Sequence, residues 1–127
     1  MAELDAIGLV TTNMSESCRF YRTLGLDVPE PAPDEQHFEV TLPSGVRLMW
    51  DTVDVVKQFD PEWQPPVGQG IGLAFRCDGA AGVDATYQRL VDAGFAGANE
   101  PWDAFWGQRY AKLLDPDGVP VDLYATL

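Results

Sequence analysis

Polar side chains recur at every second position in one segment of the chain. His37 and Glu39 alternate with apolar residues. Arg47 and Asp51 do the same a few residues later. Residues two apart in a strand lie on one face of a sheet, so these four side chains are expected on a common face. They combine hydrogen-bond donors with acceptors, which could orient a polar ligand in a pocket. The alternative interpretation is that this face of the sheet is exposed to solvent and binds nothing.

A second polar set lies near the C-terminus. Tyr110 and Lys112 are two residues apart, and Asp122 follows in the next apolar segment. If the two segments pair as strands without a bulge, all three side chains share a face. Neither polar set indicates acid–base catalysis, because the sequence shows no acid and base held at a fixed separation and no nucleophile motif.

Four large aromatic residues occur where loops are predicted: Trp63, Trp102, Phe105 and Trp106. An aromatic residue in a loop is less automatically part of the core than one inside a strand, so these rings could enclose a flat ligand. They could equally cover the ends of a sheet or a contact between subunits. His37 and Trp106 could hold a planar ring between them, although their spacing alone favours a polar strand end and a core residue.

The first half of the chain predicts a strand, a helix and a hairpin. Residues 6–11 form the strand, and Asn13 with Glu16 resembles a capping box that starts a helix ending near Gly25. Three prolines then exclude regular structure before a hairpin of residues 37–42 and 46–52.

The second half repeats this order. Residues 71–75 predict a strand, and a helix with Tyr87 and Leu90 on its apolar face ends at Gly94. Pro101 closes a loop, after which residues 109–114 and 119–124 form a second hairpin.

The two halves together predict an α+β fold built from tandem βαβββ modules that form a curved mixed sheet. The modules span about 1–56 and about 70–127 of a single domain, and a proline-rich linker of about 57–69 joins them. The helix-facing positions include Phe38, Leu48 and Trp50, and also Ile71 in the second half.

Length and charge narrow the class of protein. The 127 residues are 46% hydrophobic, enough for one packed domain, and a net charge of -12 has the wrong sign for binding phosphate backbones. Cys18 and Cys77 lack the spacing of a zinc or redox motif and are expected to be buried thiols. With no signal peptide and no apolar run of membrane length, a cytoplasmic protein without membrane or nucleic-acid partners is expected.

Four segments then carry a resemblance that covers nearly the whole chain: AIGLV at 6–10, FYRTLGL at 20–26, IGLAF at 71–75 and DPDGVPVDLY at 115–124. In combination they resemble the vicinal oxygen chelate superfamily, which includes glyoxalases, ring-cleaving dioxygenases and antibiotic-binding resistance proteins. RLMWDT at 47–52, with PW at 101–102 and WGQRY at 106–110, is most similar to the mitomycin-binding members.

The resemblance also bears on metal binding. The enzymes of this superfamily carry His or Glu ligands near the starts of the first and fifth strands and on the last strand of each repeat. Here those positions hold Ala6, Met49, Gly72 and Asp122. One carboxylate falls short of the several N or O donors that a divalent metal needs, so neither a catalytic metal nor another cofactor is expected.

For function, the resemblance implies binding of a planar aromatic antibiotic rather than catalysis. It also implies a homodimer, and members of this superfamily often swap modules between the two chains. His37 and Trp106 would stack on the ligand, and Trp63 and Trp102 would enclose it. The remaining predicted contacts are polar anchors and one adaptable thioether: Glu39, Asp51, Asp122, Tyr110 and Met49. Two alternatives stay open, namely a metal-dependent enzyme acting on a small oxygenated substrate and a carrier of an aromatic biosynthetic intermediate.

Overall fold

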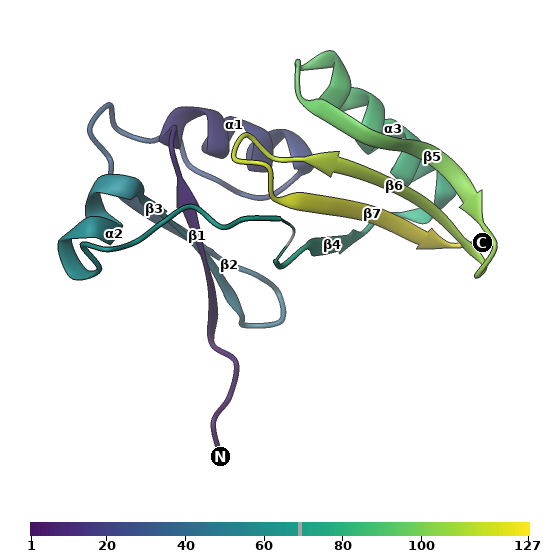
Figure 1. Cartoon of the computed structure of the whole chain (residues 1–127). Coiled ribbons are helices and arrows are strands. Elements are labelled where there is room, and N and C mark those ends of the chain that lie inside the picture. The colour runs from purple at the N-terminus through teal and green to yellow at the C-terminus, as the bar shows by residue number, and fades with distance from the viewer. Residues whose placement is uncertain (69) are drawn as a thin grey trace. The chain divides into compact units, whose positions relative to one another are not determined.

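The computed structural model describes residues 1–68 and 70–127 and consists of two compact units, Met1–Pro65 and Pro66–Leu127 (Figure 1). Each unit contains its own sheet and at least one helix, which confirms the predicted α+β class. The division falls within the segment predicted as the linker. Gln69, at the end of that linker, lies outside the described residues.

The first unit is a three-stranded sheet with two helices. In chain order its elements are β1 (Ala6–Thr11), α1 (Met14–Leu24), β2 (His37–Thr41), β3 (Arg47–Thr52) and α2 (Val53–Phe59). The strand order is β1-β3-β2, with β1 parallel and β2 antiparallel to β3. The first unit therefore has one strand fewer than a βαβββ module. Pro29, Pro31 and Pro33 lie between α1 and β2, and proline lacks the backbone N–H that a strand ladder uses.

Both ends of α1 follow the sequence signals. Asn13 caps the helix by accepting a hydrogen bond from the Glu16 backbone N–H at 3.1 Å. The reciprocal half of the capping box is absent, because the Glu16 carboxylate pairs with Arg19 instead. At the other end Gly25 has a φ of 127°, and its N–H and that of Leu26 close the last turn.

The helix α2 was not predicted, and its residues overlap the predicted linker. Thr52 caps it by accepting a hydrogen bond from the Val55 backbone N–H at 3.4 Å, and Val56 is buried. Seven residues make fewer than two full turns, too short a segment for a helical period to be recognised in the sequence.

The core of the first unit lies between α1 and the sheet. Phe38, Leu48 and Trp50 are buried there, as the strand alternation predicts. The rings of Phe38 and Trp50 are stacked at 4.4 Å, and Tyr21 of α1 contacts Trp50 at 4.7 Å. Aromatic packing on the helix-facing side therefore fixes which side chains of β2 and β3 point to the opposite, open face.

The second unit is a complete βαβββ module. Its elements are β4 (Leu73–Arg76), α3 (Gly79–Asp92), β5 (Ala96–Ala104), β6 (Gln108–Leu114) and β7 (Pro120–Thr126). The strand order is β4-β7-β6-β5, with β4 parallel to β7 and the other pairs antiparallel. Helix α3 packs on one face of this sheet, where Leu90, Leu113 and Leu123 are fully buried (Figure 1).

Two predictions for the second unit are wrong. The strand predicted at 71–75 begins at Leu73, and Ile71, which was expected to face the helix, is 72% exposed. Trp102 lies within β5 rather than in a loop, although Pro101 precedes it. β5 is an edge strand whose register with β6 shifts between Asn99 and Trp102, and an irregular edge strand tolerates proline.

Cys18 is buried and Cys77 is half-buried, and both are free thiols. Burial raises the pKa of Cys18 to about 11, so this thiol is protonated at neutral pH. In the described part of the chain no helix is long and apolar enough to cross a bilayer; α3, the longest, has 14 residues.

Candidate functional site

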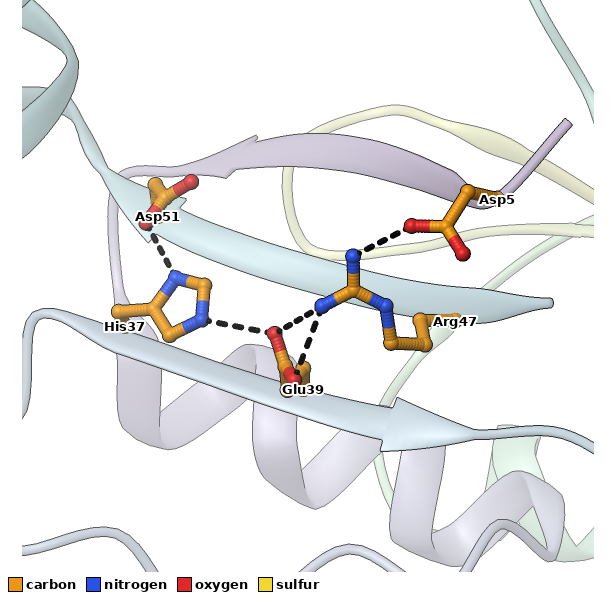
Figure 2. Close-up of polar contacts among 5 residues, drawn as sticks. All are labelled: Asp5, His37, Glu39, Arg47 and Asp51. Carbon is orange, nitrogen blue, oxygen red and sulfur yellow. Dashed lines mark hydrogen bonds and ion pairs between the residues drawn. The ribbon is translucent and has the colours of Figure 1, made fainter. Parts of the chain in front are cut away.

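The open face of the first sheet carries a row of charged side chains, which we call the polar ladder: Asp5, His37, Glu39, Arg47 and Asp51 (Figure 2). Strand register brings most of them together, since His37 pairs with Asp51 and Glu39 pairs with Met49 across β2 and β3. The common face predicted for His37, Glu39, Arg47 and Asp51 is thus confirmed.

Charges of opposite sign alternate along the polar ladder. His37 Nδ1 lies 2.6 Å from Asp51 Oδ1, and His37 Nε2 lies 3.2 Å from Glu39 Oε2. Arg47 donates to both oxygens of Glu39 at 3.1 Å and to Asp5 Oδ2 at 2.7 Å. Figure 2 shows the imidazole between the carboxylates of Asp51 and Glu39. The guanidinium lies between those of Glu39 and Asp5, so Glu39 contacts both cations.

These contacts shift the pKa values of the ladder. The hydrogen bond to Asp51, with a further one to Glu39, raises the pKa of His37 against the opposing effect of burial. The pKa of Glu39 is lowered by its hydrogen bonds to His37 and then to Arg47. Both shifts favour the ionised forms, so His37 is held as a cation over a wider pH range than a free histidine.

The polar ladder is better suited to orienting a ligand than to transferring a proton. Both nitrogens of His37 already face carboxylates, which leaves no ring nitrogen free to accept a proton from a ligand. The imidazole is nevertheless half-exposed, as are the side chains of Glu39 and Arg47. The arrangement can therefore offer a fixed imidazolium surface and charged groups to a ligand.

The second unit carries an aromatic cluster, which we define as Trp102, Phe105, Trp106 and Tyr110. Trp106 is its centre, because its ring lies close to perpendicular to Trp102 at 5.5 Å, to Phe105 at 4.9 Å and to Tyr110 at 5.4 Å. Phe105 is 91% exposed, Trp106 47% and Trp102 39%. The cluster thus presents a substantial aromatic surface to its surroundings.

Gln108 holds the central ring of this cluster. The Trp106 indole N–H donates to Gln108 Oε1 at 2.8 Å. Sequence reasoning did not identify Gln108, since an amide two residues from a tryptophan has many possible orientations. It also missed Asp5, which meets Arg47 only because β1 runs parallel to β3 from Ala6 onward.

Tyr110 connects the aromatic cluster to a polar pair on the same sheet. Its hydroxyl donates to Asp122 Oδ2, and Lys112 Nζ lies 3.8 Å from Asp122 Oδ1. Burial, reinforced by the hydrogen bond to Asp122, raises the pKa of Tyr110 to about 12. The β6–β7 register has no shift, which satisfies the condition under which Tyr110, Lys112 and Asp122 share a face.

The predicted site residues are divided between the two units. His37, Glu39, Met49, Asp51 and Trp63 belong to the first, and Trp102, Trp106, Tyr110 and Asp122 belong to the second. The structure brings His37, Glu39 and Asp51 together in the ladder and brings Trp102, Trp106 and Tyr110 together in the cluster. Trp63 is half-buried beyond α2. The stacking of His37 and Trp106 on one ligand stays a prediction.

The positions that the superfamily's enzymes use for a metal do not fit one here. Ala6 and Gly72 offer no side-chain donor, Met49 offers a thioether, and Asp122 is already bound to Tyr110. Within residues 1–68 and 70–127, no group of three or more His, Cys, Asp or Glu side chains is placed to hold a metal ion.

Comparison with known proteins identifies the family. The model of the Glyoxalase/Bleomycin resistance protein/Dioxygenase superfamily matches residues 3–123, so the chain belongs to this superfamily. No curated protein matches the chain.

Solved structures share the fold. A glyoxalase/bleomycin resistance protein/dioxygenase family enzyme from Burkholderia phytofirmans is 18% identical, with 99% of this chain and 100% of that one covered and a TM-score of 0.84. A glyoxalase/bleomycin resistance protein/dioxygenase from Nocardioides is 23% identical, with 100% and 85% covered and a TM-score of 0.75. A protein from Agrobacterium tumefaciens, solved by NMR, is 27% identical, with 100% and 99% covered and a TM-score of 0.75.

Proposed function

We propose that this protein binds and sequesters a planar aromatic antibiotic, such as a mitomycin-like quinone or a related polycyclic natural product, and confers resistance by lowering the free drug concentration. The observation that carries the proposal is the aromatic cluster, in which Trp102, Phe105 and Trp106 expose ring surface. A flat ligand that covers these rings removes apolar surface from water and gains stacking.

The order within the cluster supports a binding role. Trp106 is held by Gln108 and by ring contacts with Trp102 and Tyr110, so its indole loses little conformational freedom when a ligand stacks on it. Exposed aromatic groups held in a fixed arrangement are costly in water unless a ligand or partner covers them.

The other predicted roles belong to the same proposal. His37 is the second stacking group, Glu39 and Asp51 anchor polar groups of the ligand, and Met49 adapts to its edge. Trp63 encloses the ligand. A homodimer, in which a second copy completes each site, remains part of the proposal.

A metal-dependent enzyme is the second candidate, because the similar Burkholderia structure is described as a family enzyme. A carrier of an aromatic biosynthetic intermediate would use the same binding site as a resistance protein. The enzyme differs from both in requiring a metal and in consuming its ligand.

Titration of intrinsic fluorescence with mitomycin C, on protein treated with a chelator, tests the proposal. Saturable quenching at one ligand per chain is expected, with no change after a divalent metal is added. Phe105→Ala should weaken binding about tenfold, because one stacked ring is lost. Phe59→Ala, which removes an exposed phenylalanine from the end of α2, is the matched control. Binding or turnover that appears only with added metal would favour the enzyme.

A further inference from the structure

We infer that Tyr110 and Asp122 make the site selective for planar aromatic ligands that carry an ammonium group or another N–H donor. The inference rests on the proposed ring binding and adds the chemical class of the ligand. It is carried by two acceptor atoms beside the aromatic cluster, Asp122 Oδ1 and the Tyr110 hydroxyl oxygen.

The polar atoms and the rings lie on the same face of the second sheet. Trp102 pairs with Tyr110 across β5 and β6, and Lys112 pairs with Asp122 across β6 and β7. The intervening side chains, among them Ala111 and Leu113, are buried on the side that α3 covers. A ligand stacked on the cluster would thus extend along the face on which Asp122 lies.

Asp122 has one oxygen in use and one without a donor. Its Oδ2 accepts a hydrogen bond from the Tyr110 hydroxyl. Its Oδ1 is buried and has no hydrogen-bond partner among the described residues. Lys112 Nζ lies 3.8 Å from Oδ1, which is beyond hydrogen-bonding distance. The lysine therefore offsets the negative charge of Asp122 but donates no hydrogen bond to Oδ1.

Tyr110 adds a second acceptor. Its hydroxyl proton is committed to Asp122 Oδ2. The phenolic oxygen keeps a lone pair that can accept a further hydrogen bond. Two adjacent acceptors suit an ammonium or amide N–H, whereas a ligand carboxylate would face the negative charge of Asp122.

The Lys112 ammonium group competes with a ligand cation for the space next to Asp122 Oδ1, and it can move away. Its side chain is partly exposed and has a flexible four-carbon stem, so the ammonium group can turn to water when a ligand cation approaches Asp122. The net charge of -12 also attracts cations to the whole chain, and a test has to separate this general effect from recognition at Asp122.

Three pyrene probes with the same ring system provide the test: 1-pyrenemethylammonium, 1-pyrenemethanol and 1-pyrenecarboxylate. Energy transfer from tryptophan to pyrene reports binding to the full chain. The ammonium probe should bind about tenfold more tightly than the carboxylate probe. Asp122→Asn should reduce that ratio to about threefold or less while binding of 1-pyrenemethanol persists. Asp78→Asn, at an exposed position that makes no side-chain cap on α3, changes the net charge equally and should preserve the ratio.

Each outcome bears on the inference. A ratio that survives Asp122→Asn, or that falls equally in Asp78→Asn, overturns it. Equal binding of all three probes overturns the inference but keeps the ring site, whereas binding of none overturns both. If Asp122→Asn does not fold, Lys112→Ala takes its place: removal of the competing cation should tighten the ammonium probe several-fold, while Lys57→Ala should not. No tightening in Lys112→Ala overturns the inference.

Discussion

In the first unit the open face of the sheet is charged and its groups are paired with one another. In the second unit the open face carries the aromatic cluster, and Asp122 Oδ1 beside it has no hydrogen-bond donor among the residues that the structure describes. The polar ladder joins two cations to three carboxylates in one chain of contacts. The aromatic cluster has ring contacts and two hydrogen bonds, from Trp106 to Gln108 and from Tyr110 to Asp122, yet it exposes most of Phe105.

This difference separates two ways in which a sheet face can serve a ligand. A paired row of charges is already satisfied without a ligand, so it orients what binds more than it drives binding. Exposed rings gain from being covered, and a buried carboxylate oxygen that lacks a donor gains from a new hydrogen bond. We therefore expect a ligand to gain more binding free energy from the aromatic cluster than from the polar ladder.

Joint removal of the two predicted stacking groups should have the largest effect. His37→Ala combined with Trp106→Ala should weaken mitomycin C binding about 30-fold or more, because each stacked ring contributes about 1–3 kcal/mol. The single variants should differ, with Trp106→Ala costing more than His37→Ala. Isothermal titration calorimetry of all four proteins measures this, with thermal unfolding as the control for folding. Unchanged affinity in the double variant would remove both groups from the site.

A smaller effect is expected from a change beneath the second sheet. A Cβ at Gly97 of β5 would overlap the Tyr87 phenol and lie 2.9 Å from its Cζ, so Gly97→Ala must displace a side chain that is 9% exposed. The free energy of unfolding should fall by about 1–2 kcal/mol in urea titrations. Gly70→Ala is the matched control, since a Cβ there meets nothing within 4 Å. Equal stability of the two variants would show that Tyr87 moves without cost.

The smallest expected effect is the pH dependence of His37 in the polar ladder. Because Asp51 and Glu39 raise the pKa of His37 in the folded protein, its contribution to stability is fully present below the unfolded pKa near 6.5 and is lost as pH rises through the higher folded pKa. His37 is the only histidine, so NMR titration of its Cε1 proton needs no assignment. Asp51→Asn should move the midpoint down. A wild-type midpoint at or below the ordinary value would contradict the paired ladder.

Sequence patterns predicted the parts of this fold that depend on local chemistry. Alternation placed Phe38 and Trp50 in the core and His37 and Glu39 on the other face, and the Asn13 and Gly25 signals placed the ends of α1. These features are predictable because each depends on residues close in sequence or on the period of a strand.

The parts that sequence missed depend on tertiary context. Pro101 argues against a strand, but an edge strand with an irregular register accommodates it and carries Trp102. The pairing of Asp5 with Arg47 requires the parallel register of β1 and β3, which the two segments do not reveal by themselves. Helix α2 depends on a cap at Thr52 and on one buried residue, Val56.

An NMR titration of the tryptophan indole N–H signals with mitomycin C, in the presence of a chelator, tests whether the aromatic cluster is the binding site. The chain has four tryptophans, and buried Trp50 is an internal control. Ring binding at the aromatic cluster predicts saturable shifts of the Trp106 and Trp102 signals, with Trp50 unchanged. If the Trp106 and Trp102 signals stay fixed at saturating ligand, the aromatic cluster is not the binding site.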